Sequence, residues 1–261
     1  MQGILWQVEN VIVDEAARAH PLDLFIAMSM AKRKVILVGD HRQLPHLLEP
    51  NVTSEIQREI QAGSIEEEFK TAIEESLFQK LWYDLRKLAQ KDGISRTCRL
   101  DTQFRMHPKL GDFVSVNFYE TDGGLLSPSD VRPYVHTLAS YAQKYAAWID
   151  VPQSMGMEEK MPHDNSKYRR CEAHVIAKEV HRLLNESPDL TIGVIAFYTA
   201  QVNEIGKALV QYGVTEINET DSWDIAPRWT HAYNSDGKKV ERLRIGSVDA
   251  FQGKEFDVVL L

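Results

Sequence analysis

The sequence predicts an α/β fold with parallel sheets, divided between two domains. Short runs of apolar, often β-branched residues recur along the chain, and several of them end directly in polar or acidic side chains. Helical patterns separate these runs, as expected where a crossover helix joins two parallel strands. The chain has 261 residues, of which 43% are hydrophobic. That length is enough for one large or two modest domains, and the composition supports buried cores.

Composition and charge exclude several classes of protein. No apolar run reaches the roughly 18 residues of a membrane span, and the N-terminus shows no pattern of a secretory signal. Cys98 and Cys171 lie far apart and form no zinc-binding pattern, which favours a reduced, cytoplasmic protein. The net charge of −8 argues against a surface coated for nucleic acid. A local basic groove is still compatible with that charge.

The chain is organised around residues 10–17. An apolar, β-branched run leads straight into Asp14 and Glu15 and then into small helix formers. This order predicts a buried parallel strand, a turn and a helix over residues 16–31. Open α/β sheets carry their ligand chemistry at the carboxyl ends of strands, and two adjacent acids there suit a magnesium–nucleotide site. Taken alone, the same acids are also explained by capping of the following helix.

A second strand with a polar end follows soon after the first. Residues 34–38 predict this strand, and residues 39–45 (Gly-Asp-His-Arg-Gln-Leu-Pro) follow it. Gly39 permits a tight turn, and Pro45 stops further regular structure. A structural loop easily explains one strand with a polar end. Two such strands in succession instead favour a ligand cleft that both strand ends share.

The middle of the chain predicts helices and a junction. Residues 51–92 have a helical, acidic pattern, and Gly93 with the polar residues after it marks a junction between domains. Residues 99–102 predict a short strand or hinge, and a helix is expected from Pro108 through Phe118. A further strand is expected over residues 146–151.

The last third of the chain repeats the strand–helix pattern. Helices are expected over residues 172–185 and 202–212, and strands over residues 191–197 and 256–261. Residues 213–240 predict an insertion or hairpin that contains Trp223 and Trp229. These two side chains could stack on bases, but a small local core is the favoured interpretation.

Four motifs occur in a specific order along the chain. They are Asp14-Glu15, residues 39–44 (Gly-Asp-His-Arg-Gln-Leu), residues 103–108 (Gln-Phe-Arg-Met-His-Pro) and residues 248–255 (Val-Asp-Ala-Phe-Gln-Gly-Lys-Glu). Together they resemble the superfamily 1 helicases, specifically the up-frameshift and immunoglobulin-mu-binding branch that translocates 5′ to 3′. Each motif alone is weak evidence, whereas four in order are strong, and the resemblance covers nearly the whole chain.

The resemblance implies two incomplete RecA-like P-loop NTPase domains that face each other across an ATP cleft. Residues 1–95 are expected to be the C-terminal part of the first domain, and residues 96–261 a truncated second domain. The pattern G-x-x-x-x-G-K-[ST], which cradles phosphates in such enzymes, does not occur in the 261 residues. We therefore expect the chain to represent an internal part of a helicase and to be inactive when isolated.

The resemblance also implies roles for the nucleotide-site residues. Asp14 orients Mg²⁺ through water, Glu15 activates the attacking water, and Gln43 senses that water and the γ-phosphate. Arg105 matches the family's arginine finger, donated from the second domain, and Glu255 matches the residue that contacts the nucleotide ribose. Two further residues are plausible supporting contacts: Gln103 and Gly253. The implied cofactors are ATP and Mg²⁺, and the required parts agree with the chemistry of phosphoryl transfer.

Strand ends of the second domain are implied to line or support a nucleic-acid track. The residues concerned are Tyr198, Thr199, Ser247 and Asp249. The expected partner is single-stranded DNA or RNA, which is gripped largely through phosphates and stacking and requires no basic protein overall. Two alternatives stay open: a non-catalytic module that binds nucleic acid or a partner, and a P-loop ATPase that remodels protein.

Overall fold

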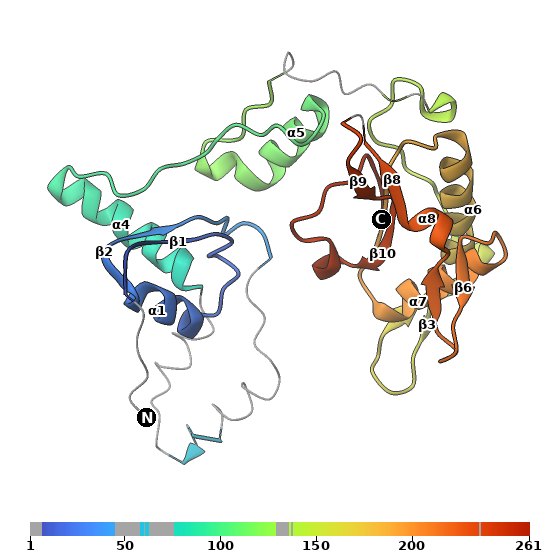
Figure 1. Ribbon diagram of the computed structural model, residues 1–261, viewed down its shortest axis with the longest axis horizontal. Coiled ribbons are helices and arrows are strands. Elements are labelled where there is room, and N and C mark those ends of the chain that lie inside the picture. The colour runs from blue at the N-terminus through green and yellow to red at the C-terminus, as the bar shows by residue number, and fades with distance from the viewer. Residues whose placement is uncertain are drawn as a thin grey trace. The chain divides into compact units, whose positions relative to one another are not determined.

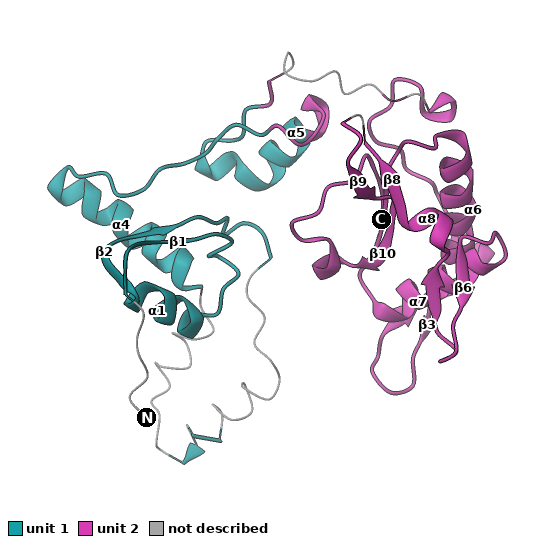
Figure 2. Ribbon diagram, viewed as in Figure 1, with its two compact units in different colours: residues 1–103, 111–126 teal, residues 104–110, 127–261 magenta. Residues whose placement is uncertain are grey.

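A computed structural model of the chain describes residues 7–44, 58–59, 61–62, 76–128, 136, 138–234 and 236–261. The chain divides into two compact units, which Figure 2 colours separately: unit 1 is residues 1–103 and 111–126, and unit 2 is residues 104–110 and 127–261. Each unit contains parallel strands together with helices, so the predicted α/β class is confirmed. No helix in the described part of the chain is long and apolar enough to span a membrane.

Unit 1 begins with a strand–helix–strand motif. In the part of the chain up to residue 126 that the structure describes, the elements are β1 (Val8–Val13), α1 (Pro21–Ser29), β2 (Ala31–Leu37), α4 (Leu77–Asp92), α5 (Pro108–Val114), the π-helix η1 (Ser115–Tyr119) and the 3₁₀ helix η2 (Glu120–Asp122). β1 and β2 pair in parallel, with Val13 opposite Leu37, and α1 contacts both strands (Figure 1). This is the arrangement expected of a crossover helix between parallel strands.

The first helix begins later than predicted. The helix predicted over residues 16–31 is present as α1, but its predicted start is wrong, because residues 14–18 form a turn and α1 begins at Pro21. Proline lacks an N–H and has a φ suited to a first helical turn, so it fits this position. His20 caps the helix, and its Nδ1 accepts a hydrogen bond of 3.2 Å from the N–H of Leu22.

The prediction that the first strand is buried is also wrong for the described part of the chain. Ile12 in β1 is 68% exposed and Ile36 in β2 is 47% exposed. The cause is that the described sheet of unit 1 has two strands, and α1 packs against them. The small buried cluster of the unit lies at the carboxyl ends of the strands instead and consists of Ala16, Ala17, Leu24 and Phe78.

Helix α4 contributes Phe78 to this cluster. Ser76 caps it by accepting from the N–H of Gln79, and Gly93 ends it in the left-handed conformation at φ 72°. Phe78 near its start is buried. The helical pattern over residues 51–92 is therefore confirmed for residues 77–92, and most of residues 51–75 lie outside the described part of the chain.

The segment after α4 contacts residues 122–126, which belong to the same unit. Thr102 forms an isolated parallel bridge with Leu126, and the N–H of Gln103 donates to the carbonyl of Leu126 at 2.9 Å. Arg99 donates to the carbonyls of Asp122 and Gly124. The helix expected from Pro108 is present, but after residue 114 it widens into the π-helix η1.

Unit 2 is built on a three-stranded parallel sheet in the order β10–β5–β11. Its remaining elements are η3 (Ala139–Tyr141), η4 (Gln153–Met155), β3 (Glu159–Lys160), β4 (Lys167–Tyr168), α6 (Arg170–Glu186), β5 (Ile192–Ala196), α7 (Thr199–Val210), β6 (Thr215–Ile217), β7 (Trp223–Ile225), α8 (Pro227–Thr230), β8 (His231–Tyr233), β9 (Lys239–Glu241), β10 (Leu243–Ser247), η5 (Val248–Phe251) and β11 (Val258–Leu260). The central strand β5 is almost wholly apolar, as expected of a parallel strand covered on both faces.

Close packing on β5 depends on Gly193. A Cβ at that position would lie 2.7 Å from the ring of Phe251, so the glycine makes room for the aromatic side chain over the sheet. Helices α6 and α7 contribute many of the buried side chains of the same core, among them Val180, Leu183, Leu184, Ile205 and Leu209.

Residues 213–240 form two antiparallel hairpins, β6–β7 and β8–β9, joined by α8. Trp223 packs over Gly206 of α7, and Trp229 is buried with the guanidinium carbon of Arg242 at 4.7 Å from its ring centroid. Both indoles therefore pack in the main core of unit 2, not in the small local core favoured from the sequence and not on a free stacking surface.

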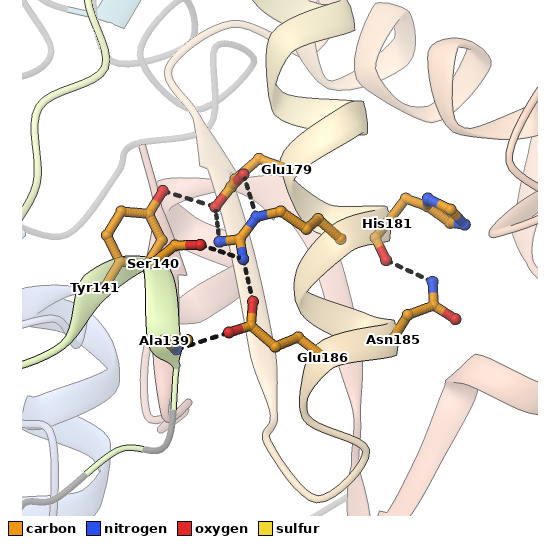
Figure 3. A network of polar contacts seen from close by, with 8 residues as sticks. Ala139, Ser140, Tyr141, Glu179, His181, Asn185 and Glu186 are labelled. Carbon is orange, nitrogen blue, oxygen red and sulfur yellow. Dashed lines mark hydrogen bonds and ion pairs between the residues drawn. The ribbon is translucent and has the colours of Figure 1, made fainter.

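The segment before α6 contains no strand over residues 146–151, so that prediction is wrong. These residues have no ladder partner, and Trp148 is 92% exposed. Instead, η3 is held to α6 by a polar network. The hydroxyl of Tyr141 donates to Glu179 at 2.6 Å, and the N–H of Ala139 donates to Glu186 at 2.7 Å (Figure 3).

Candidate functional site

The acidic pair lies in a tight turn directly after β1. Glu15 has a left-handed backbone conformation with φ 53°, and its N–H donates to Oδ1 of Asp14 at 2.9 Å. A non-glycine residue with positive φ is uncommon, and such residues cluster at functional sites. Both acidic side chains are exposed. The turn therefore presents two carboxylates at the carboxyl end of a parallel strand.

The ends of β1 and β2 are packed backbone to backbone. The N–H of Ala16 donates to the carbonyl of Val38 at 2.8 Å, which continues the pairing beyond both strands. A Cβ on Gly39 would lie 2.8 Å from the N of Ala17, so this approach requires glycine. The acidic turn and residues 39–44, which we call the glutamine loop, are therefore neighbours, as the two polar strand ends predict.

The carboxylate of Asp40 organises the glutamine loop. Its Oδ1 accepts from the N–H of Arg42 at 2.9 Å, and its Oδ2 accepts from Nε2 of Gln43 at 3.0 Å. The ring of His41 lies edge-on to Tyr83 of α4, with 5.7 Å between centroids. These contacts fix both the backbone of the loop and the side chain of Gln43.

Residues from η1 and η2 reach the same loop. The hydroxyl of Tyr119 donates to Oδ2 of Asp40, and Arg42 donates to Asp122 at 2.9 Å and to Thr121 at 2.8 Å. Burial raises the pKa of Tyr119 well above its ordinary value, and the hydrogen bond to the Asp40 carboxylate adds to that shift. Sequence reasoning missed these residues, because they lie in a different segment and match no motif.

In unit 2, Arg105 and Glu255 form an ion pair. Nε of Arg105 lies 2.7 Å from Oε1 of Glu255, although the residues are 150 positions apart. Glu255 lies between η5 and β11, two residues after Gly253, which has φ +70°. Both paired side chains are more than 60% exposed. Exposed pairs of this kind contribute about 0–1 kcal/mol, so a ligand can readily replace either partner.

Gln103 lies just before Arg105 in the sequence. It belongs to unit 1, where its N–H donates to the carbonyl of Leu126. The structure thus brings together Arg105 and Glu255, and separately Asp14, Glu15 and Gln43 through their neighbouring strand ends.

The four residues expected near nucleic acid lie at or just after the carboxyl ends of strands β5 and β10 in unit 2. Tyr198 and Thr199 follow β5 directly, Ser247 ends β10, and Asp249 lies in η5. The parallel register, with Ser247 opposite Ala196, places these two strand ends side by side. Phe197 at the same edge is 79% exposed. The sequence predicts Phe197 as the last residue of a buried strand, whereas β5 ends at Ala196. An aromatic residue at the end of an apolar run could have indicated an exposed ring beside the site.

The fold and these residues define a class of protein. Parallel α/β units with acids and a glutamine loop at adjacent strand ends are the RecA-like arrangement of P-loop NTPases. Two family models, both described as "AAA domain", match residues 1–49 and 73–261. The chain therefore belongs to the AAA domain family, and the resemblance to superfamily 1 helicases of the up-frameshift branch is confirmed.

Curated relatives match nearly the whole chain. It is 30% identical over 96% of its length to the protein named helicase sen1 of Schizosaccharomyces pombe. It is 29% identical over 98% to the ATP-dependent helicase upf1 of the same organism, and 29% identical over 82% to the mouse protein named 3'-5' exoribonuclease HELZ2. The chain spans 12%, 23% and 7% of these proteins, respectively.

Proposed function

We propose that this chain contributes ATP-hydrolysing and strand-binding residues to a helicase or translocase that moves 5′ to 3′ on single-stranded DNA or RNA. One observation carries the proposal. The acidic turn and the glutamine loop are packed side by side at the ends of β1 and β2, in a chain whose relatives include named helicases. That is the arrangement in which a metal-bound nucleotide and an attacking water can be held together.

We further propose that the family's domain boundary lies at residues 95 and 96, with the first RecA-like domain before it and the second after it. The two compact units of the structure have a different boundary, because residues 96–103 and 111–126 belong to unit 1. By resemblance to the family, the arginine-finger motif begins the second domain.

The acidic turn fits a magnesium–nucleotide. Mg²⁺ in such sites is bound through one or two carboxylates, with phosphates and water completing the shell. The exposed Asp14 supplies such a carboxylate, and the described residues contain no group of three acidic, histidine or cysteine side chains that would suit an all-protein metal cage. Bound Mg²⁺ would neutralise part of the negative charge on the phosphates of ATP.

The remaining nucleotide-site residues activate the attacking water, neutralise transition-state charge and position the nucleotide. Glu15 accepts a proton from the attacking water, and the amide of Gln43 orients that water. Arg105, as the finger of the second domain, neutralises the charge that develops in the transition state. Glu255 binds the ribose hydroxyls as an acceptor, and two residues support these contacts: Gln103 and Gly253.

The exposed edge of the unit 2 sheet is the proposed track for the nucleic acid. Tyr198, 43% exposed, supplies an aromatic face for base stacking. Hydroxyl and carboxylate groups beside it provide hydrogen bonds to the strand, from Thr199, Ser247 and Asp249. Cys98 and Cys171 are free cysteines, which suits a reducing compartment, so we propose a cytoplasmic location.

A non-catalytic role is the second candidate for the chain by itself. The observation that favours it is the absence of the G-x-x-x-x-G-K-[ST] pattern from the 261 residues. Backbone N–H groups and the lysine of that loop supply much of the phosphate binding in this class. A chain without them would bind nucleic acid or a partner without hydrolysing ATP.

The rate of ATP hydrolysis by the full-length gene product, with and without single-stranded DNA or RNA, separates these functions. Stimulation by a single strand supports a helicase or translocase. Hydrolysis that no nucleic acid stimulates would instead indicate an ATPase that remodels protein. Binding of single strands without any hydrolysis would indicate the non-catalytic module.

A further inference from the structure

The carboxylate of Asp40 is the centre of a polar cluster that extends beyond the 39–44 motif to Tyr119. It accepts hydrogen bonds from the backbone N–H of Arg42, from the side-chain amide of Gln43 and from the hydroxyl of Tyr119. Two of these donors belong to the glutamine loop itself, whereas Tyr119 arrives from a segment 79 residues further along the chain. Asp40 therefore connects Gln43 to Tyr119.

The cluster determines which end of the Gln43 amide is available for chemistry. An ionised carboxylate only accepts hydrogen bonds, so the NH₂ group of Gln43 must face Asp40. Its carbonyl oxygen, Oε1, is then left to accept a hydrogen bond from a water molecule. A Gln amide held in the opposite orientation would present donors to that water instead.

The π-helix η1 places Tyr119 against Asp40. Helix α5 widens after residue 114, and Tyr119 is the last residue of the five in η1. π-helical turns are rare and occur frequently at functional sites, because they change the direction of the side chains that follow. A second connection lies beside it, where Arg42 donates to Thr121 and Asp122.

We propose that Tyr119 is a positioning residue for ATP hydrolysis. Through Asp40, its hydroxyl holds the Gln43 amide in the orientation that directs Oε1 toward the attacking water. The inference rests on the proposed function, because the role of Gln43 comes from there. In this role Tyr119 acts through Asp40 and not directly on the nucleotide or the attacking water.

A matched control exists elsewhere in the chain. Tyr141 also donates its hydroxyl to a carboxylate, that of Glu179, but it belongs to the network that holds η3 to α6 (Figure 3). Tyr119→Phe and Tyr141→Phe therefore each remove one hydroxyl and one hydrogen bond to a carboxylate. Only the first of these changes acts on the glutamine loop.

Amide hydrogen exchange on the chain described here tests the connection without any enzymatic activity. We expect Tyr119→Phe to accelerate exchange of the Arg42 amide, which donates to Asp40, by about tenfold. Exchange in β1 and α1 should stay unchanged, which also shows that the variant is folded. Unchanged exchange at Arg42, or equal acceleration by Tyr141→Phe, would overturn the inference.

Steady-state kinetics of the full-length product tests positioning as opposed to a structural role. We expect Tyr119→Phe to lower kcat by about 10- to 100-fold with little change in KM for ATP, since misplacing a catalytic group acts on the chemical step. In a Gln43→Ala background, the same substitution should have no further effect. Tyr141→Phe should retain the parent kcat.

The outcomes separate this inference from the proposed function. If Gln43→Ala abolishes hydrolysis while Tyr119→Phe keeps the full kcat, the positioning role is overturned and the proposed function stands. If Gln43→Ala hydrolyses ATP normally, the proposed role of Gln43 fails, and the positioning role fails with it. A loss of kcat by Tyr119→Phe that adds to the loss by Gln43→Ala also overturns the inference, because the two residues would then act independently.

Discussion

Glu15 combines an unusual backbone conformation with an exposed carboxylate. Its φ of 53° lies in the left-handed region, where a non-glycine side chain is disfavoured, and its own N–H is satisfied by Asp14. Strain of this kind is retained where the surrounding structure imposes it. Here the constraint comes from Ala16, whose N–H continues the pairing to Val38. The turn therefore fixes the direction of the Glu15 side chain.

In the full-length product, Glu15→Gln should retain nucleotide binding and lose hydrolysis. The amide has nearly the same shape as the carboxylate but cannot accept a proton, and general-base contributions are about 10²–10⁴ in rate. Nucleotide affinity is measured by equilibrium binding and turnover by phosphate release. A variant that keeps more than about half the parent rate would be inconsistent with a general base at this position.

For single residues, the sequence predicts which ones lie at strand ends, but it does not predict the contacts between distant segments. Asp14, Glu15 and Gln43 follow apolar runs, so their positions on the sheet could be expected. The contact between Tyr119 and Asp40 depends on the π-helical width of η1, which no periodicity of the sequence reveals. The pairing of Arg105 with Glu255 joins two motifs, but the sequence does not show that they meet.

Elements follow the predicted order, and their ends depend on local chemistry. Pro21 moves the start of α1 five residues beyond the expected position, and the predicted strand over residues 146–151 finds no partner. Apolar patterning correctly locates β5, α6 and α7, because their side chains form one buried core. Strand formation at residues 146–151 fails because an extended run also needs a neighbouring ladder to satisfy its backbone groups.

The contact of α7 with the β6–β7 hairpin predicts an unusual response to Gly206→Ala. Alanine favours a helix over glycine by about 1 kcal/mol, but a Cβ here would overlap the indole of Trp223. Overpacking costs about 1–3 kcal/mol, so we expect Gly206→Ala to lower the free energy of unfolding. In a Trp223→Ala background the same substitution should raise it by about 1 kcal/mol. Equal effects in both backgrounds, measured by chemical denaturation, would contradict the packing.

The attachment of η3 to α6 should depend on pH. Arg182 donates to Glu179, and together with the hydroxyl of Tyr141 this lowers the pKa of Glu179 below its ordinary value of 4.5. A lowered folded-state pKa gives a stability contribution that is present above the unfolded-state pKa and is lost as the pH falls through the folded-state value.

We therefore expect Glu179→Gln to lower the free energy of unfolding at pH 7 by about 1 kcal/mol, and the difference from the parent chain should shrink below pH 4.5. Denaturation at pH 7 and at acidic pH measures both quantities. Glu216→Gln, at an exposed position of β6, is the control and should leave stability nearly unchanged. A deficit that is constant with pH would show that the carboxylate charge is not responsible.

The whole chain contains the four motifs that match the helicase family but not the pattern that cradles phosphates. We expect the isolated 261-residue chain to hydrolyse ATP at the background rate, because the G-x-x-x-x-G-K-[ST] pattern is absent from it. Phosphate release by the purified chain, compared with its Glu15→Gln variant, measures this. Robust turnover that Glu15→Gln abolishes would mean that other residues bind the phosphates.

Arg105 is the residue that makes hydrolysis depend on both domains in the proposed function. By resemblance, it acts from the second domain on phosphates held by the first, so it contributes when a bound strand favours the closed state. An arginine finger is worth about 10³–10⁵ in rate, whereas an exposed ion pair contributes about 0–1 kcal/mol. Arg170 is a matched control, because its side chain is 60% exposed, against 61% for Arg105, and also pairs with glutamate.

The most direct test is the strand-stimulated ATPase rate of the full-length product and its Arg105 variants. We expect Arg105→Ala to abolish stimulation by single-stranded DNA or RNA while the fold and strand binding are retained. Arg105→Lys should restore little, because lysine keeps the charge but loses the planar guanidinium. Arg170→Ala should hydrolyse ATP at the parent rate. Normal stimulated hydrolysis by Arg105→Ala would contradict the finger assignment and, with it, the proposed coupling of ATP hydrolysis to strand binding.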